Sequence, residues 1–212
     1  MRASVLIGPE TSEVQDVPLP PVGEGDILVR VEACGVCFSG YHDWHGTEDT
    51  TYPQVMGHEP SGVIEQVGAG VTTLSVGQRV AVMPTGSGPF TQYSNGGYAE
   101  YLVAPQERAA LIPEGVSFTE AMGEPLACLV SAADRTPVRL GDRVALVGCG
   151  FMGSALLQLV ALRGPKDIVV VDIRADALEN ARRLGADQAL RPEEIAPEDR
   201  LVEWDNMGQG ID

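Results

Sequence analysis

Residues 143–153 read Arg-Val-Ala-Leu-Val-Gly-Cys-Gly-Phe-Met-Gly, an apolar run that passes directly into three glycines spaced Gly-x-Gly-x-x-Gly. The apolar run predicts a buried strand, and residues 154–163, which follow the glycines, predict a helix. A second apolar run, 167–171, ends at Asp172. Alone, such a glycine pattern is weak evidence, but between a strand and a helix it predicts a turn that binds a dinucleotide.

Each glycine of this turn has its own task. Gly148 permits the tight turn, Gly150 lets the backbone approach a pyrophosphate, and Gly153 allows the helix to pack closely on the strand. Phe151 and Met152 lie between them and complete the candidate cofactor-binding turn. The pyrophosphate is expected at the helix N-terminus, where free N–H groups and the helix dipole favour negative charge.

Asp172 and Arg174 bear on which dinucleotide binds. Asp172 lies 24 residues after Gly148, close to the offset of about 20 for the acid that accepts hydrogen bonds from the adenosine ribose. A carboxylate there repels a 2′-phosphate, which favours NAD over NADP. Arg174 keeps NADP open as the less favoured cofactor. A helix over 175–184 and a short strand over 188–190 continue the alternation.

The N-terminal part of the chain has a different pattern. Its apolar runs are short, rich in β-branched residues and bounded by Gly and Pro, which predicts a compact, largely antiparallel β-domain. Helical spacing over 119–134, interrupted by Pro125, predicts a connection between two domains, and 84–97 is expected to be a loop. The expected strands are 5–7, 27–31, 62–67, 79–82 and 98–103.

All three histidines of the chain lie between residues 37 and 59, together with a cysteine and a glutamate. This stretch begins Cys-Phe-Ser-Gly-Tyr-His-Asp-Trp-His at 37–45 and ends Gly-His-Glu at 57–59. Thiolate, imidazole and carboxylate are side chains that bind zinc, so the stretch is a candidate metal centre.

The other cysteines are interpreted differently. Cys34 forms a C-x-x-C pair with Cys37, but one pair is only half of a zinc knuckle, and we interpret Cys34 as a core residue. Cys128 and Cys149 are expected to be small packing residues. Their uneven spacing, in a chain without an apparent export signal, disfavours disulfides.

Composition limits the possible partners. The 212 residues include 30 acidic and 14 basic ones, a net charge of -16, which argues against binding to nucleic acid or to an anionic membrane surface. No apolar run approaches the roughly 18 residues of a membrane span. The apolar run within residues 1–9 has only three residues, which is too short for the apolar segment of a signal peptide. We expect a soluble, cytoplasmic protein whose partners are small molecules or proteins.

These motifs together resemble the zinc-dependent medium-chain dehydrogenase/reductase family, in its alcohol and polyol branch that includes sorbitol dehydrogenase. The resemblance rests on Gly57-His58-Glu59-Pro-Ser-Gly62, with further matches at 33–37, 76–80, 97–101 and 124–127. It implies an α/β fold with a β-rich part. A GroES-like catalytic β-domain would cover 1–136, and part of a Rossmann doubly wound parallel sheet would cover 137–212, with the active site in the cleft between them.

The resemblance also implies a function and a set of site residues. The function is hydride transfer between a secondary alcohol, polyol or cyclitol and NAD(P), with one catalytic zinc. Cys37 and His58 correspond to zinc ligands, and Glu59 corresponds to a ligand or to a neighbouring carboxylate that exchanges with water. Glu124 stands where the polyol branch has a glutamate that binds zinc directly or through water. Ser39 and His42 match the proton-relay pair.

Three departures from the family pattern affect these expectations. Gly40 stands where relatives carry an aspartate that orients the ligating histidine, and Asp43 is the available substitute. The loop 84–97 has none of the cysteines of a structural zinc site, so we predict no structural zinc. Only 76 residues follow Thr136, whereas a complete dinucleotide domain occupies roughly 150, so the sequence looks like a truncated dehydrogenase.

Truncation motivates a second hypothesis of a different class. The chain would be a catalytically inactive binding subunit, with its open sheet edge covered by another copy or by a completing chain. A zinc-free quinone or enoyl reductase is disfavoured, because those relatives lack the pair Cys37 and His58.

Overall fold

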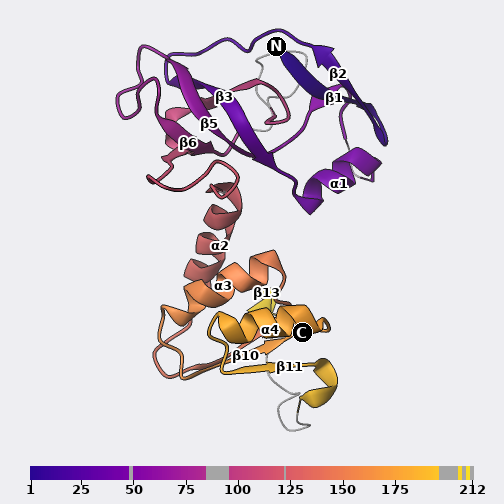
Figure 1. Cartoon of the computed structure of the whole chain (residues 1–212), viewed down its shortest axis with the longest axis vertical. Helices are drawn as coiled ribbons and strands as arrows, with labels where there is room; N and C mark the ends of the chain where they lie inside the picture. The colour runs from indigo at the N-terminus through magenta and orange to yellow at the C-terminus, as the bar shows by residue number, and fades with distance from the viewer. Residues whose placement is uncertain (48–49, 85–95, 122, 196–204, 207–208, 211–212) are drawn as a thin grey trace. The chain divides into compact units, whose positions relative to one another are not determined.

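The computed structural model describes residues 1–47, 50–84, 96–121, 123–195, 205–206 and 209–210. The chain divides into two compact units, Met1–Glu124 and Pro125–Asp212 (Figure 1). This division falls inside helix α2 (Gly123–Arg135), whereas the boundary expected from the sequence lies just past the other end of that helix.

The first unit is built on a five-stranded sheet in which every neighbouring pair is antiparallel. Alternate residues of the strands face one core, which contains Ile27, Val29, Ile64, Val80 and Leu102. This confirms the antiparallel β-domain. The strand order is β7 (Tyr101–Pro105), β3 (Asp26–Gly35), β5 (Glu59–Val67), β6 (Arg79–Val82) and β8 (Ala109–Leu111).

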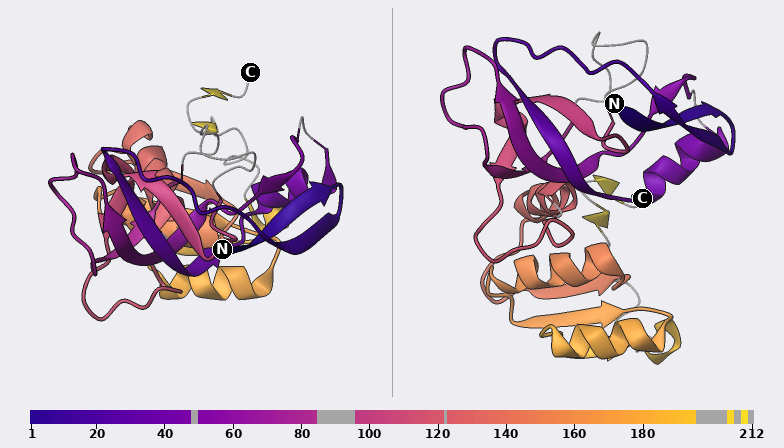
Figure 2. Two further views of the ribbon diagram at one scale, coloured as in Figure 1. Left: turned by 90° about the horizontal axis from the view of Figure 1, so that it is seen from above. Right: turned by 45° about the horizontal axis from the view of Figure 1, so that its top comes forward.

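A second, smaller sheet of this unit has the order β2 (Thr11–Asp16), β1 (Arg2–Gly8), β4 (Gln54–Val55), again antiparallel. The hairpin of β1 and β2 lies beside helix α1 (Phe38–His45), as Figure 1 and the right-hand view of Figure 2 show. At its tip, the Glu10 N–H donates a hydrogen bond to the Trp44 carbonyl (2.6 Å), and the Glu10 carboxylate pairs with His45 Nδ1.

Helix α1 was not expected from the sequence. It begins directly after Cys37, and it ends at Gly46, whose left-handed conformation (φ 71°) lets its N–H bond back to the Asp43 carbonyl. Glycine adopts this conformation without the steric cost that a side chain carries. The metal-ligand stretch therefore begins at a helix N-terminus.

The second unit contains a parallel sheet of order β11 (Gln188–Leu190), β10 (Asp167–Val171), β9 (Arg143–Val147). Helices α3 (Phe151–Ala161) and α4 (Ala175–Arg183) connect the strands, and their apolar side chains pack on the sheet. The predicted order of strand, glycine turn, helix and strand is confirmed. The remaining elements are the 3-10 helices η1 (Gln106–Arg108) and η2 (Pro192–Glu194) and the short strands β12 (Asp205–Asn206) and β13 (Gln209–Gly210).

Several local expectations were wrong. Pro125 does not interrupt a helix, because α2 starts at Gly123 and proline is tolerated in a first turn. The expected strand at 98–103 starts at Tyr101. Cys128 is exposed rather than packed, while Cys149 is buried, and no disulfide joins the four cysteines. None of the helices in the described part of the chain is long and apolar enough to cross a bilayer.

Candidate functional site

The pairing of β3 with β5 brings the predicted metal ligands together. In the ladder, Gly35 lies opposite Glu59. Cys37 follows Gly35 by two residues, and His58 precedes the first residue of β5. As a result, the Cys37 thiol, a ring nitrogen of His58 and a carboxylate oxygen of Glu59 all lie within 4.8 Å of one another.

Two glycines make this approach possible. A Cβ on Gly35 would lie 2.0 Å from Glu59 Oε2, so no larger residue fits opposite Glu59. Gly57 has φ 96°, a conformation that L side chains rarely adopt. The backbone on both sides of the donor group therefore requires glycine.

The donor set fits zinc. Tetrahedral zinc with Zn–S of about 2.3 Å and Zn–N of about 2.0 Å needs ligand atoms about 3.3–3.6 Å apart, which small side-chain rotations supply from the observed spacing. Glu59 is only 8% exposed, and a buried carboxylate is unfavourable unless it is paired or coordinates a metal. Thiolate, imidazole and carboxylate oxygen are also the donor types that zinc prefers.

The predicted relay residues lie on α1. Ser39 Oγ is 3.4 Å from His58 Nε2, so the hydroxyl is next to the donor group. His42 lies three residues further along the helix, a spacing that places it on the same side as Ser39. Its Nδ1 is 3.4 Å from Thr47 Oγ1.

Other residues of the motif stand apart from the donor group. Glu124 lies in the first turn of α2 and is not among the three residues whose ligand atoms converge. The Asp43 carboxylate accepts a hydrogen bond from Thr50 (3.5 Å), and His45 pairs with Glu10. Cys34 is half-buried, and burial raises the pKa of its thiol to about 11. Most of the loop 84–97, for which we predict no structural zinc, lies outside the described residues.

The glycine turn in the second unit has the geometry expected of its residues. Gly148 has φ 86°, and Gly150 is the residue that precedes the first turn of α3. A Cβ on Gly153 would lie 2.0 Å from the Gly148 carbonyl oxygen, whereas a Cβ on Gly150 would meet nothing within 4 Å. Gly153 is thus required for packing, and the space beside Gly150 is open.

Asp172 is tied to this turn. Its Oδ2 accepts a hydrogen bond from the Cys149 N–H (2.7 Å) and its Oδ1 accepts one from the Arg174 N–H (2.8 Å). These two bonds, the first being the larger effect, lower the pKa of the Asp172 carboxyl below its usual value. The carboxylate is therefore ionised and held in place beside the turn.

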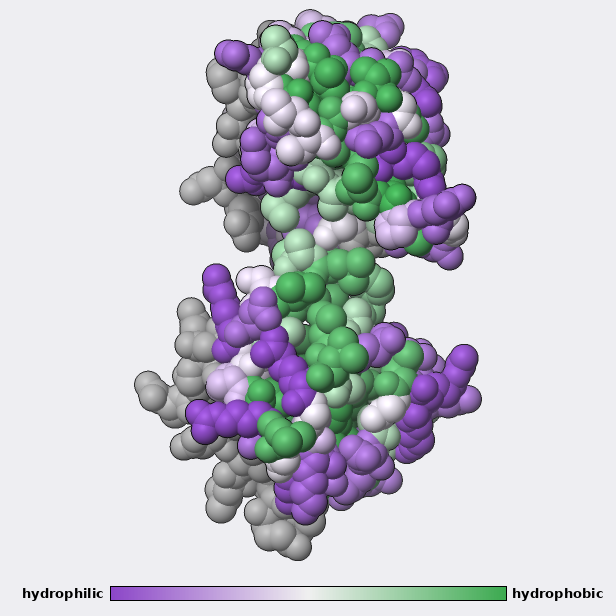
Figure 3. Space-filling model, turned by 90° about the vertical axis from the view of Figure 1, so that its left-hand side faces the viewer, coloured by the Kyte–Doolittle hydropathy of each residue, from purple (hydrophilic) through white to green (hydrophobic). Residues whose placement is uncertain are grey.

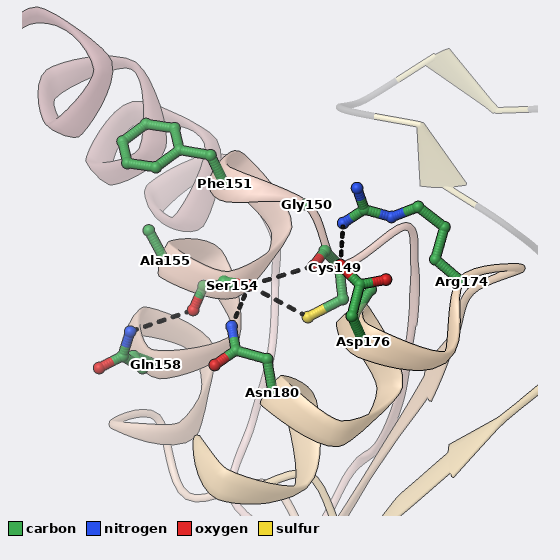
Figure 4. Close-up of a pocket in the computed structure, with 10 residues that line it drawn as sticks. Cys149, Gly150, Phe151, Ser154, Ala155, Gln158, Arg174, Asp176 and Asn180 are labelled. Atoms are coloured by element: carbon green, nitrogen blue, oxygen red, sulfur yellow. Dashed lines mark hydrogen bonds and ion pairs between the residues drawn. The ribbon is translucent and has the colours of Figure 1, made fainter.

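A pocket of about 400 Å³ opens next to the turn (Figure 4). Of the predicted cofactor residues, Gly150, Phe151 and Arg174 line it, while Gly148, Met152, Gly153 and Asp172 do not. The pocket also has polar lining residues that the sequence did not indicate: Ser154, Gln158, Asp176 and Asn180.

Two interactions organise this lining. Asn180 Nδ2 donates a hydrogen bond to Ser154 Oγ (3.2 Å), and Arg174 pairs with Asp176 at 3.6 Å, both drawn in Figure 4. Ser154 follows the glycine turn directly, which is a signal that the sequence contains. Asn180 comes from the next helix, and nothing in its local sequence marks it.

Comparison with known proteins finds similar chains among the alcohol and polyol dehydrogenases. Residues 23–114 match the alcohol dehydrogenase GroES-like domain. The chain is 34% identical to an alcohol dehydrogenase from Geobacillus stearothermophilus and 31% identical to human sorbitol dehydrogenase, in each case over 91% of its length. It spans 62% of the length of each of these two relatives.

A solved structure shows the same relationship. The chain superimposes with a TM-score of 0.79, at 29% identity, on a protein from Sinorhizobium meliloti described as a zinc-binding dehydrogenase bound to NADP, and the match covers 91% of this chain and 62% of the other. The motifs, the two folds and these similarities agree: residues 23–114 form an alcohol dehydrogenase GroES-like domain, and the chain is similar over 91% of its length to alcohol and polyol dehydrogenases of the medium-chain dehydrogenase/reductase family.

Proposed function

We propose that this chain supplies the metal centre and the nucleotide turn of an oxidoreductase that transfers a hydride between a secondary alcohol, polyol or cyclitol and NAD. The observation that carries the proposal is the convergence of Cys37, His58 and Glu59, whose ligand atoms all lie within 4.8 Å of one another. This geometry supports one catalytic zinc. Glu124 stays a proposed further ligand, direct or through water.

Residues of the chain itself are proposed to transfer the proton and to hold the cofactor. A zinc ion, when bound, supplies Lewis-acid polarisation of the substrate oxygen. Ser39 lies next to His58, and its Oγ would accept the substrate hydroxyl proton as it gives up its own hydroxyl proton toward His42. His42, on the same side of α1, would then release a proton to solvent. The N–H groups at the start of α3 would hold the pyrophosphate of the cofactor.

Asp172 supports NAD as the cofactor. Its carboxylate is ionised and fixed by two backbone N–H groups, and a fixed negative charge repels the 2′-phosphate of NADP. Arg174 is the feature that favours NADP, but it pairs with Asp176. NADP therefore remains the less favoured cofactor.

Metal content tests the proposal. After purification in zinc-supplemented buffer, elemental analysis should give one zinc per chain, and Cys37→Ser and His58→Ala should each lose it. Cys128→Ser, which removes an exposed thiol from the other unit, is the matched control and should keep its zinc. Reduction of NAD in the presence of sorbitol or a secondary alcohol then tests the reaction. A wild-type chain without zinc would refute the proposal.

A second candidate, a binding subunit that works with another chain, is favoured by one observation. In the parallel sheet, the only described neighbour of β9 is β10. Apolar side chains on β9 and in the turn before it are exposed: Val147 (63%) and Leu140 (87%). Figure 3 shows hydrophobic surface on the face of this unit turned to the viewer. Exposed edges of this kind pair readily with other chains.

Light scattering combined with activity separates the two candidates. The binding-subunit candidate predicts a homo-oligomer, or a complex with a completing chain, and no hydride transfer by the isolated chain. A monodisperse monomer that turns over alcohol would exclude it.

A further inference from the structure

Residues 96–99 form a connection between two parts of the first unit. On one side, the Ser4 N–H donates a hydrogen bond to the Tyr98 carbonyl (2.8 Å). On the other side, the Tyr98 N–H donates to the Met56 carbonyl (2.9 Å) and the Gly97 N–H donates to the Gly57 carbonyl (2.7 Å). The backbone that precedes His58 is therefore bonded to a segment that β1 holds in place.

The Tyr98 side chain reaches both segments that carry metal donors. Its hydroxyl donates a hydrogen bond to the Gly35 carbonyl (3.2 Å), two residues before Cys37. Its ring lies against Gly57, where an added Cβ would come within 2.7 Å of a ring carbon. One rigid side chain thus spans the distance between the segment that leads to Cys37 and the residue next to His58.

The surroundings of Tyr98 leave little freedom for it to move. A Cβ on Gly97 would lie 2.8 Å from both the Cys34 thiol and Pro60 Cβ, so the segment is closely packed on the donor side. Burial, with smaller effects from Cys34, Glu59 and Cys37, raises the pKa of the Tyr98 hydroxyl to about 12. The hydroxyl therefore keeps its proton and donates across the physiological pH range.

From these contacts we propose that Tyr98 is a positioning residue for the metal centre, which holds the segments bearing Cys37 and His58 at the spacing that a single cation requires. The inference rests on the proposed zinc site. It extends that proposal to a residue that does not itself touch the metal. Groups that orient metal ligands typically change metal affinity about 10- to 100-fold when they are removed.

Tyr98→Phe tests this role, because it keeps the ring and removes only the hydroxyl. We expect zinc affinity, measured by competition with a chromophoric chelator, to fall about tenfold. We also expect the cobalt-substituted protein to show altered d–d and thiolate-to-cobalt bands. The matched control is Tyr101→Phe in β7, which removes the same atom from a strand of the same unit and should leave affinity and spectrum unchanged.

Circular dichroism of the metal-free proteins separates positioning from general destabilisation. Under the proposal, both variants melt close to wild type without metal, and only Tyr98→Phe shows the altered cobalt spectrum. Wild-type zinc affinity and spectrum in Tyr98→Phe would overturn the inference and leave the proposed zinc site standing. Failure of the wild-type chain to bind zinc or cobalt would instead refute the proposed function.

Discussion

Gly40 is the departure from the family pattern whose effect on metal binding a substitution can test directly. A side chain at this position has room, because an added Cβ would meet nothing within 4 Å. Gly40→Asp would restore a carboxylate of the kind that orients a ligating histidine, and we expect zinc to bind about tenfold more tightly. Chelator competition measures the affinity. Gly40→Ala controls for the helix propensity gained by losing glycine, and an equal gain in both variants would contradict the prediction.

Asp176 sets the charge of the nucleotide pocket beside Arg174. Asp176→Asn removes a negative charge and releases the arginine for a 2′-phosphate. Because both side chains are exposed, we expect only a few-fold gain in NADPH affinity, equivalent to about 0.5–1 kcal/mol, and little change for NADH. Fluorescence titration measures both. Glu179→Gln, the same charge change on α4 but outside the pocket lining, should alter neither affinity.

The metal donors could be read from the sequence, while the residues that support them could not. Cys37, His58 and Glu59 belong to a local motif whose chemistry is specific to metals. Tyr98 supports them through contacts with residues 41 and 63 positions away in the chain, and such contacts leave no local pattern. Asn180, which reaches Ser154 from another helix, was missed for the same reason.

The glycine turn between β9 and α3 is closely packed at Gly153 and open at Gly150, and substitution at each position tests this difference. Gly153→Ala forces a Cβ to 2.0 Å from the Gly148 carbonyl, which should cost about 1–3 kcal/mol of unfolding free energy. Gly150→Ala has space and should cost under about 1 kcal/mol, yet its methyl group would intrude where the pyrophosphate approaches. Urea unfolding and NADH titration should therefore separate the variants. A stable Gly153→Ala would refute the packing argument.

The hydrogen bond from Cys149 to Asp172 ties the end of β10 to the same turn and predicts a pH dependence. The pKa of Asp172 is lower in the folded chain than in the unfolded chain, so its stabilisation is complete above the unfolded pKa of about 3.9 and is lost as the pH falls through the lower folded pKa. The difference in unfolding free energy between wild type and Asp172→Asn, measured in urea, should be constant at neutral pH and shrink below about pH 4. A difference that grows in acid would contradict this.

Strands with a continuous apolar run were predicted well. Elements whose formation depends on contacts with distant parts of the chain were not. The strands 79–82 and 143–147 match the structure residue for residue. Helix α1 has no buried residue and contains Gly40, so neither apolar spacing nor propensity marks it. Strand β2 is mostly exposed and polar, and it was missed because it is defined by its pairing with β1.

The whole molecule carries a net charge of -16, which predicts a salt effect on stability. Like charges repel in the folded state, and salt screens this repulsion because the Debye length falls from about 30 Å at 0.01 M to about 8 Å at 0.15 M. The thermal midpoint, followed by circular dichroism, should rise by a few degrees between these salt concentrations. Glycerol at matched osmolality controls for general solvent effects. A midpoint that falls with salt would show that attractive pairs outweigh the repulsion.

The cross-strand neighbours Gly35 and Glu59 have a consequence for how the protein is made. Cys37, His58 and Glu59 all lie within the first 59 residues, and the pairing of β3 with β5, which ends at Val67, brings them together. This point in the chain comes well before β9 begins at Arg143. Domains form from the N-terminus as the chain leaves the ribosome. A nascent chain can therefore bind its cation before the second unit is translated. The bound ion would then hold β3 and β5 together in the newly formed sheet.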